Sequence, residues 1–248
     1  MKKFLLTTVA LAALGTATSA SAADLAARPY TKAPPIIATV YDWTGFYIGA
    51  NGGWGTQRRC GTDVTFAPFA ALGCHDADGG VAGGQIGYRW QTAGWVFGLE
   101  AQGDWADLKG SNVSQVFAPQ TLQSRMNAFG LFTGQIGYAW NNTLLYVKGG
   151  AAVTSNNYRD VATVGGATLA SAGDSTRWGG TVGVGLEYGF TPNWTFGVEY
   201  DHLFIGSKNY DLTTPGGLFF GTARVSGDAD IVTARINYKW GGPVIARY

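Results

Sequence analysis

Large apolar residues fall at every second position over much of the chain between residues 43 and 240. This is the period of a β-strand whose two faces meet different surroundings. The pattern predicts eight strands, at about residues 43–54, 79–90, 95–105, 124–140, 143–154, 176–190, 194–204 and 225–240. Four longer segments, at about residues 55–78, 106–123, 155–175 and 205–224, are expected to be glycine-rich loops, and the other connections are expected to be short turns.

A short motif recurs four times at a spacing of fifty residues. It reads GQIGYRW at Gly84–Trp90, GQIGYAW at Gly134–Trp140, GLEYGF at Gly185–Phe190 and RINYKW at Arg235–Trp240. A repeat of this length also occurs in kelch-type propellers, whose blades need four short strands each. Here each repeat holds only two long strands and one long segment, so we interpret the motif as the second strand of each of four hairpins.

All nine tryptophans fall at or near the ends of predicted strands. They are Trp43, Trp54, Trp90, Trp95, Trp105, Trp140, Trp178, Trp194 and Trp240. A soluble β-sandwich would bury tryptophans in mid-strand, whereas a membrane barrel places aromatic rings in two girdles at the interfaces. In lipid, a sheet must also close on itself, because an open edge leaves backbone groups unpaired. The sequence therefore predicts an all-β, eight-stranded antiparallel up-and-down transmembrane β-barrel. A soluble secreted β-protein is the alternative.

The N-terminal segment has the features of a secretory signal peptide. Lys2 and Lys3 precede an apolar stretch, Phe4–Leu14, and a small-residue cleavage site ends at Ala22. We expect a signal peptide at residues 1–22, a proline-rich periplasmic linker at residues 23–42 and the barrel at residues 43–248. An even number of strands would place both chain termini in the periplasm.

Composition favours the same class of protein. Charged residues make up 13 % of the chain, about half the share usual for soluble domains. Without the two lysines of the signal peptide, 15 basic residues stand against 16 acidic ones. A balance this close to neutral gives no broad basic surface, so nucleic acid is not an expected partner.

The two cysteines, Cys60 and Cys74, are expected to form a disulfide. An even pair of cysteines in an exported protein favours this bond, because the compartment is oxidising. A metal site that also used His75 is the alternative, but it would lack a fourth ligand.

The polar face of the predicted strands gathers four acidic and four basic residues. They are Arg89, Glu100, Lys148, Glu187, Glu199, Asp201, Arg235 and Lys239. One interpretation is the lining of a conducting pore or a catalytic cluster. The other is a charge-compensated plug, because an eight-stranded barrel is only just wide enough for its own side chains. We expect the plug, with little steady conductance.

Several segments together resemble the small porin-like outer-membrane β-barrel surface antigens of Gram-negative bacteria. These are WTGFYIGANGGWG at Trp43–Gly55, the GYRW and GYAW strand ends, and the last strand, DIVTARINYKW. The resemblance implies an eight-stranded barrel of the OmpA type, with roles as a surface antigen and in envelope stability. It also implies an assembly signal at Tyr238 and Trp240, although the chain continues to Tyr248 and the signal could end there.

The resemblance also implies partners. They are outer-membrane lipid and lipopolysaccharide, the barrel-assembly machinery, and peptidoglycan or another envelope component. A small porin and a surface receptor acting through the four long segments are alternative functions, and some family members bind haemin. His75 and His202 are the candidate haemin ligands. No cofactor is expected, and no enzyme activity either, because the chain lacks a G-x-S-x-G elbow and a paired His–Ser arrangement.

Overall fold

The computed structural model describes residues 41–65, 70–113, 120–162 and 168–240. The ten strands are β1 (Gly45–Asp63), β2 (Ala70–Thr92), β3 (Trp95–Val113), β4 (Gln120–Trp140), β5 (Thr143–Ala162), β6 (Thr168–Gly189), β7 (Trp194–Phe204), β8 (Lys208–Thr213), β9 (Phe219–Ser226) and β10 (Ala229–Lys239). Among the described residues, none lies in a helix long and apolar enough to cross a membrane. The expected signal peptide, most of the expected linker and the segment ending at Tyr248 lie outside the described residues.

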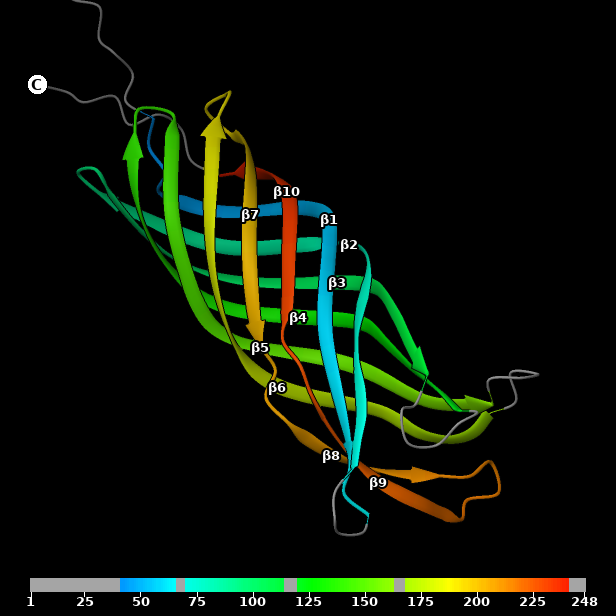
Figure 1. Ribbon diagram of the computed structural model, residues 1–248. Coiled ribbons are helices and arrows are strands. Elements are labelled where there is room, and N and C mark those ends of the chain that lie inside the picture. Colours follow the sequence, from blue (N-terminus) through cyan, green and yellow to red (C-terminus); the bar gives the residue numbers. More distant parts are fainter. Residues whose placement is uncertain (1–40, 66–69, 114–119, 163–167, 241–248) are drawn as a thin grey trace, which may run out of the picture. The chain divides into compact units, whose positions relative to one another are not determined.

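The strands form one closed antiparallel sheet (Figure 1). Neighbours in sequence pair in order from β1 to β7, β7 pairs with β10, and β10 closes the ring on β1 from Tyr47↔Lys239 to Gln57↔Ala229. Beyond Gln57, β9 takes over from β10 beside β1, and Cys60 lies opposite Ser226. The ring therefore has eight strands, and the expected eight-stranded antiparallel barrel is confirmed.

The two ends of the barrel differ. At one end, which we name the turn end, short turns join β2 to β3, β4 to β5 and β6 to β7. Ala93 and Asn141 have positive φ angles there, of 54° and 51°. Asparagine tolerates this backbone conformation better than most residues, and Asn141 lies in the short turn that joins β4 to β5. The opposite end, with the β8–β9 hairpin, is named the extended end.

The prediction of four long loops is wrong for most of their length. Three of these segments consist largely of continued strands, from β1 to β6. On β1 the strand runs nine residues past Trp54, to Asp63. In this part Gln57 and Arg59 are buried while Thr56 and Arg58 are exposed. The inside–outside alternation persists, but both faces are polar, so a pattern of hydrophobicity could not reveal it. The fourth expected loop contains the β8–β9 hairpin.

Bulges change which face a residue occupies. The β4 register shifts between Met126 and Ala128, opposite a shift on β3 beyond Trp105. Strict alternation from the buried Gln135 and Thr133 would place Arg125 on the inner face as well. Its side chain is instead 52 % exposed, because the extra residue of a bulge reverses the alternation.

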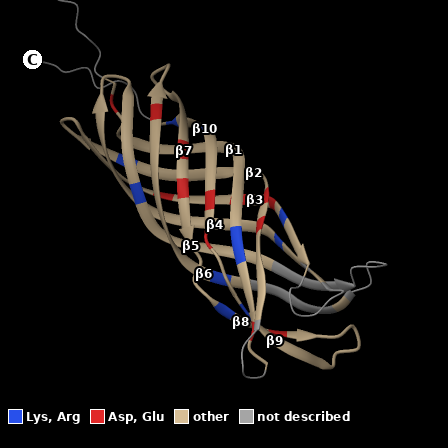
Figure 2. Cartoon of the chain, in the orientation of Figure 1, with Lys and Arg blue, Asp and Glu red and all other residues tan. Residues whose placement is uncertain are grey.

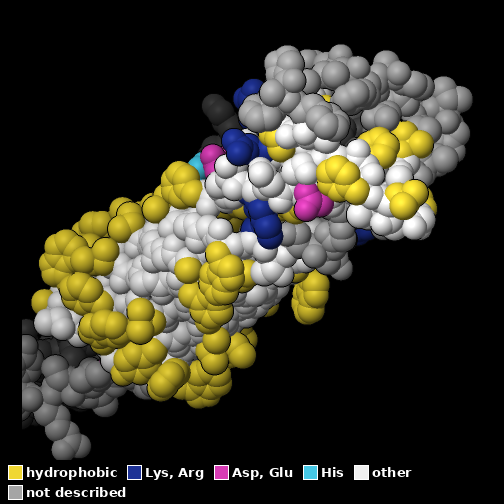
Figure 3. Space-filling view, turned by 90° about the horizontal axis from the view of Figure 1, so that it is seen from below, with side chains coloured by type: hydrophobic (Ala, Val, Ile, Leu, Met, Phe, Trp, Pro, Cys, Tyr) yellow, Lys and Arg dark blue, Asp and Glu magenta, His cyan; other side chains and the backbone are white. Residues whose placement is uncertain are grey.

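A belt of exposed apolar side chains runs over all eight strands of the ring. Figure 3 shows the belt on one face of the barrel. Trp95 and Trp105 mark its two edges on β3, with 52 % and 76 % of their surface exposed. Ten residues separate them, which is about 33 Å along a strand. At the tilt usual for membrane barrels this corresponds to about 25 Å, the height of the apolar band of an outer-membrane barrel. Six further tryptophans are exposed: Trp54, Trp90, Trp140, Trp178, Trp194 and Trp240.

Trp43 does not belong to either girdle, contrary to expectation. It is only 1 % exposed, packs against Tyr41 and donates its backbone N–H to Gln91 Oε1 at 2.9 Å. Trp43 precedes the first residue of β1, Gly45, so strand alternation does not determine its direction. The chain instead turns this side chain into the mouth of the barrel.

The Cys60–Cys74 disulfide lies in the extension between β1 and β2. The two residues are direct cross-strand partners, their sulfurs are bonded, and their Cα atoms are 4.1 Å apart. The bond closes a segment with a sequence separation of 14, for which a chain-entropy estimate is about 3 kcal/mol.

We predict that reduction of this disulfide loosens the extension without opening the barrel. Trypsin cleavage after the exposed Arg58 should become at least about tenfold faster in reductant, because local opening then costs less free energy. Fragment analysis of the folded protein measures the rate. A Cys60→Ser/Cys74→Ser variant should be cleaved rapidly with or without reductant, and an unchanged rate after reduction of the native protein would contradict the prediction.

Candidate functional site in the barrel lumen

All eight charged residues expected on the inner face lie inside the barrel, and each is at most 5 % exposed. They come from β2, β3, β5, β6, β7 and β10, at positions where strand alternation points the side chain inward. Figure 2 shows basic and acidic positions spread over the strands of the barrel. Five of them form one group, which we name the charged cluster: Glu100, Lys148, Glu199, Asp201 and Arg235.

The charged cluster is built around two cations. Lys148 Nζ lies 2.7 Å from Glu199 Oε1, 3.2 Å from Asp201 Oδ2 and 3.5 Å from Glu100 Oε1. The Arg235 guanidinium forms ion pairs with both Glu100 and Glu199. Each glutamate therefore contacts both cations. Such sharing offsets the large cost of removing the charges from water.

A separate ion pair, outside the charged cluster, lies nearer the turn end. Arg89 donates through both terminal nitrogens to Glu187, at 3.0 and 2.8 Å, in the bidentate geometry that suits a guanidinium and a carboxylate. Asn237 and Thr195 also donate to Glu187. The guanidinium carbon of Arg89 lies 4.5 Å from the centre of the Tyr47 ring, which adds a cation–π contact.

Lys239 differs from the other seven. Its ammonium donates to the backbone carbonyl of Asp42 and lies 5.1 Å from the centre of the Tyr41 ring. It therefore fastens the segment before β1 to the last strand. Together with Trp43 this segment covers the lumen at the turn end, in a group that we name the mouth cluster: Tyr41, Trp43, Val96, Leu144 and Tyr146.

Two glycines make room for tyrosine rings inside the barrel. Tyr47 lies opposite Gly87, Tyr146 lies opposite Gly185, and a Cβ added at either glycine would overlap the facing ring. Each tyrosine hydroxyl donates to a glutamate of the charged cluster, at 2.7 and 2.5 Å. The glycines thus allow the rings to lie across the strands and to bring their hydroxyls to the buried carboxylates.

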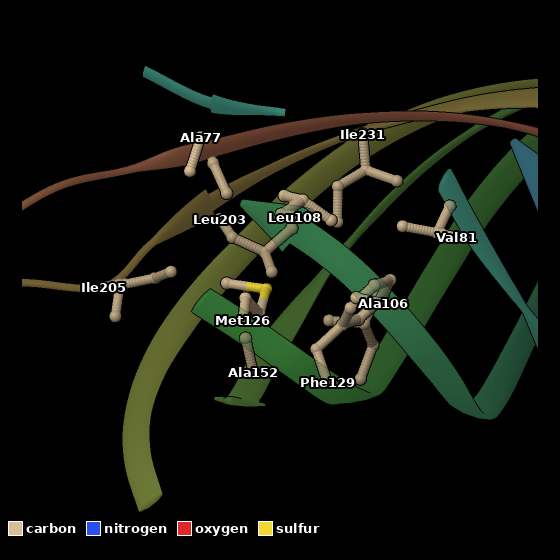
Figure 4. Packing of buried hydrophobic residues seen from close by; sticks show 12 residues of the cluster. Ala77, Val81, Ala106, Leu108, Met126, Phe129, Ala152, Leu203, Ile205 and Ile231 are labelled. Carbon is tan, nitrogen blue, oxygen red and sulfur yellow. The ribbon is translucent and has the colours of Figure 1, made fainter. Parts of the chain in front are cut away.

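An apolar layer follows the charged cluster toward the extended end. Its residues pack against one another from several strands (Figure 4), and they are Ala77, Val81, Ala106, Leu108, Met126, Phe129, Leu131, Ala152, Leu203, Ile205, Ala229 and Ile231. The order along β7 shows the sequence of layers, because Glu199 and Asp201 precede Leu203. The sequence indicates only part of this layer. Phe129 and Leu131 break the alternation on β4, as residues that cap the interior do, whereas Ala77, Ala106, Leu108 and Ile205 lie in segments expected to be loops.

Several buried polar residues were also missing from the expected network. Asp104, in mid-lumen, is 4 % exposed and accepts a hydrogen bond from Gln102 at 2.9 Å. Beyond the apolar layer, Arg59 donates to Gln57 at 2.8 Å and also to Asn156. Following the alternation of β1 past Trp54 would have placed Gln57 and Arg59 inside, whereas no local signal marks their partner on β5.

The two histidines lie outside these lumen groups, and each has a polar partner. His75 Nε2 lies 2.6 Å from Ser124 Oγ, so the expectation that the chain has no His–Ser pair is wrong; the two residues are 49 positions apart on different strands, and no local sequence signal joins them. His202 Nδ1 lies 2.7 Å from Asp230 Oδ1. Burial and the nearby Arg59 guanidinium lower the pKa of His75, which favours its neutral form. Within the described part of the chain, no three His, Cys, Asp or Glu side chains gather in a way that would hold a metal ion.

A closed antiparallel ring with an apolar belt and a buried ionic interior defines an outer-membrane β-barrel. The family described as outer membrane protein beta-barrel domain matches residues 8–217, and the chain belongs to this family. The resemblance noted in the sequence is thereby confirmed at the level of the family.

Individual relatives of the chain are also outer-membrane proteins. The chain is 29 % identical to the 31 kDa outer-membrane immunogenic protein of Brucella melitensis, over 78 % of this chain and 84 % of that protein. It is 28 % identical to the 25 kDa outer-membrane immunogenic protein of Brucella abortus, over 94 % and 96 %. The structure matches the outer membrane protease OmpT of Escherichia coli with a TM-score of 0.54 and 11 % identity, over 79 % of this chain and 97 % of that one. At this identity the likeness to OmpT concerns the fold alone.

We predict that Gly185→Ala destabilises the barrel by about 1–3 kcal/mol. The new methyl group forces the Tyr146 ring to move and disturbs its contact with the charged cluster. Urea unfolding in lipid vesicles, followed by tryptophan fluorescence, measures the change. Gly103→Ala is the control, because nothing lies within 4 Å of a Cβ at that position. Equal unfolding midpoints for the two variants would contradict the prediction.

We also predict that Arg89 and Glu187 depend on each other. Arg89→Met should cost about 3–5 kcal/mol, because it leaves a buried carboxylate without its cation. An Arg89→Met/Glu187→Gln variant should recover part of that loss, since both charges are then removed. The same urea titration tests both variants, and a double variant as unstable as the single one would argue against the coupling.

Proposed function

We propose that this protein is a non-conducting structural and surface barrel of the outer membrane, which maintains envelope integrity and acts as a surface antigen. The observation that carries the proposal is the succession of groups inside the lumen. The mouth cluster, the charged cluster and the apolar layer follow one another from the turn end toward the extended end. A continuous path for hydrated ions would have to cross a layer of paired charges and then a dry layer.

The proposed orientation follows from the two ends. Short turns and the segment before β1 lie at the turn end, which faces the periplasm, and the longer strands project outside the cell. Outer-membrane barrels have short periplasmic turns and longer extracellular segments, which supports this assignment. Both chain termini are then periplasmic.

Partners follow from the same arrangement. The apolar belt contacts outer-membrane lipid and lipopolysaccharide. The last strand, with Tyr238 and Trp240 stacked edge to face at 5.3 Å, is presented to the barrel-assembly machinery. Contact with peptidoglycan or another envelope component is assigned to the part of the linker before Tyr41, residues 23–40.

A surface receptor is the second candidate. The tip of the β8–β9 hairpin exposes three large apolar side chains, Leu218, Phe219 and Phe220, of which Leu218 is 73 % exposed. Apolar side chains at a projecting tip favour contact with another molecule. Replacement of Leu218, Phe219 and Phe220 by serine should then abolish surface binding while the barrel still folds.

We expect the folded protein to give no steady conductance in planar lipid bilayers, because its lumen is filled by its own side chains. A general porin reconstituted in the same way serves as the positive control, and heat-modifiable migration on gels verifies folding. Large and reproducible open channels from the folded protein would overturn the proposal and would favour the porin alternative.

A further inference from the structure

A polar pocket lies between the extended parts of three neighbouring strands, past the apolar belt. It has a volume of about 640 Å³, and its lining comes from β2, β3 and β4: Asp76, Lys109, Gly110, Ser111, Gln123, Ser124, Arg125 and Asn127. On the face seen in Figure 3, charged side chains gather beyond the belt, toward the extended end.

The pocket brings two cations together on neighbouring strands. Lys109 and Arg125 are direct cross-strand partners of β3 and β4, and both side chains are more than half exposed. Like charges placed directly opposite each other destabilise a sheet unless an anion lies between them. Asp107 supplies one carboxylate, at 2.7 Å from Lys109 Nζ and 2.6 Å from Arg125 Nη2.

One carboxylate does not use all the donors of this pair. An ammonium group has three N–H groups and a guanidinium has five, so several remain available after both contacts with Asp107. Guanidinium and ammonium groups are the side chains that bind phosphate most effectively. The rest of the lining consists of hydroxyl and amide groups and one carboxylate, Asp76, which suit the hydroxyl groups of a sugar.

The height of the pocket also restricts its ligand. Lys109 follows Trp105, the outer edge of the belt on β3, by four residues, which is about 13 Å along the strand. Allowing for the tilt of the strands, this is about 10 Å beyond the girdle. Phosphates of lipid headgroups lie at this level, whereas the acyl chains lie beside the belt.

We propose that this pocket binds the phosphorylated sugar headgroup of a glycolipid in the outer leaflet. Lys109 and Arg125 hold the phosphate, Asp76 accepts hydrogen bonds from sugar hydroxyls, and Ser111 and Asn127 either donate hydrogen bonds to them or accept hydrogen bonds from them. The inference rests on the proposed orientation, in which the extended end lies outside the cell. It goes beyond the proposed function by assigning a specific lipid site to one side of the barrel.

The test measures binding of lipid A to the folded full chain in detergent micelles by native mass spectrometry. Lys109→Gln/Arg125→Gln should weaken binding at least about tenfold, because both phosphate ligands are removed. Lys208→Gln/Arg224→Gln is the matched control, since it removes two exposed basic residues of the same end outside the pocket, and it should change binding less than twofold. Lipid A without its phosphates should also bind the native protein at least about tenfold more weakly than lipid A does, because the phosphate contacts are then lost from the ligand side.

Three outcomes would overturn the proposal. The first is that the pocket variant and the control bind lipid A with equal affinity. The second is that the native protein binds dephosphorylated lipid A as tightly as lipid A. The third is that inorganic phosphate at equimolar concentration displaces lipid A, which would indicate a site for free phosphate. Orientation is tested separately, by labelling a Pro215→Cys variant on intact cells with a membrane-impermeant thiol reagent. Absence of labelling would contradict the proposed function, while the result in micelles would still decide whether the pocket binds the lipid.

Discussion

Closure of the sheet by pairing between β1 and β10 is the constraint on which the rest of the structure depends. Lipid offers no hydrogen bonds to a free strand edge, so every backbone group in the apolar belt must find a partner within the sheet. Eleven paired positions from Tyr47↔Lys239 to Gln57↔Ala229 supply that closure. Once the first and last strands meet, each side chain has only two possible environments, the lipid or the lumen.

The small diameter of an eight-stranded ring then determines what the lumen contains. Its inward side chains fill it, and charges placed there must be paired within a few ångströms. Arg89 with Glu187, and Lys148 and Arg235 with their shared glutamates, meet this requirement. Gly87 contributes in a different way, because the absence of a side chain leaves room for the Tyr47 ring.

The extended end has a different role from the belt. Beyond Trp105 the outer face lies past the apolar belt, and polar and charged residues such as Lys109 occupy it. Pairing still continues, assisted by the disulfide between β1 and β2 and by the β8–β9 hairpin. The strands thereby carry a polar surface past the apolar belt, with the proposed phosphate-binding pocket close to the belt and the apolar tip of the β8–β9 hairpin farther along the chain.

Alternation of apolar and polar residues by itself determined the eight strands, the short turns and the two girdles, because lipid imposes a strict pattern on every second residue. It also identified the eight lumen charges, whose inward direction follows from parity within the belt. The alternation of inward and outward side chains does not extend before the first strand or across a bulge. It therefore gives the wrong direction for the side chains of Trp43 and Arg125. Only the tertiary structure decided which charges pair, because Arg89 and Glu187 are 98 residues apart in sequence. It also revealed most of the apolar layer and the full length of the strands. The layer faces the lumen and the extensions lie past the belt, so neither shows the alternation that lipid imposes on the belt.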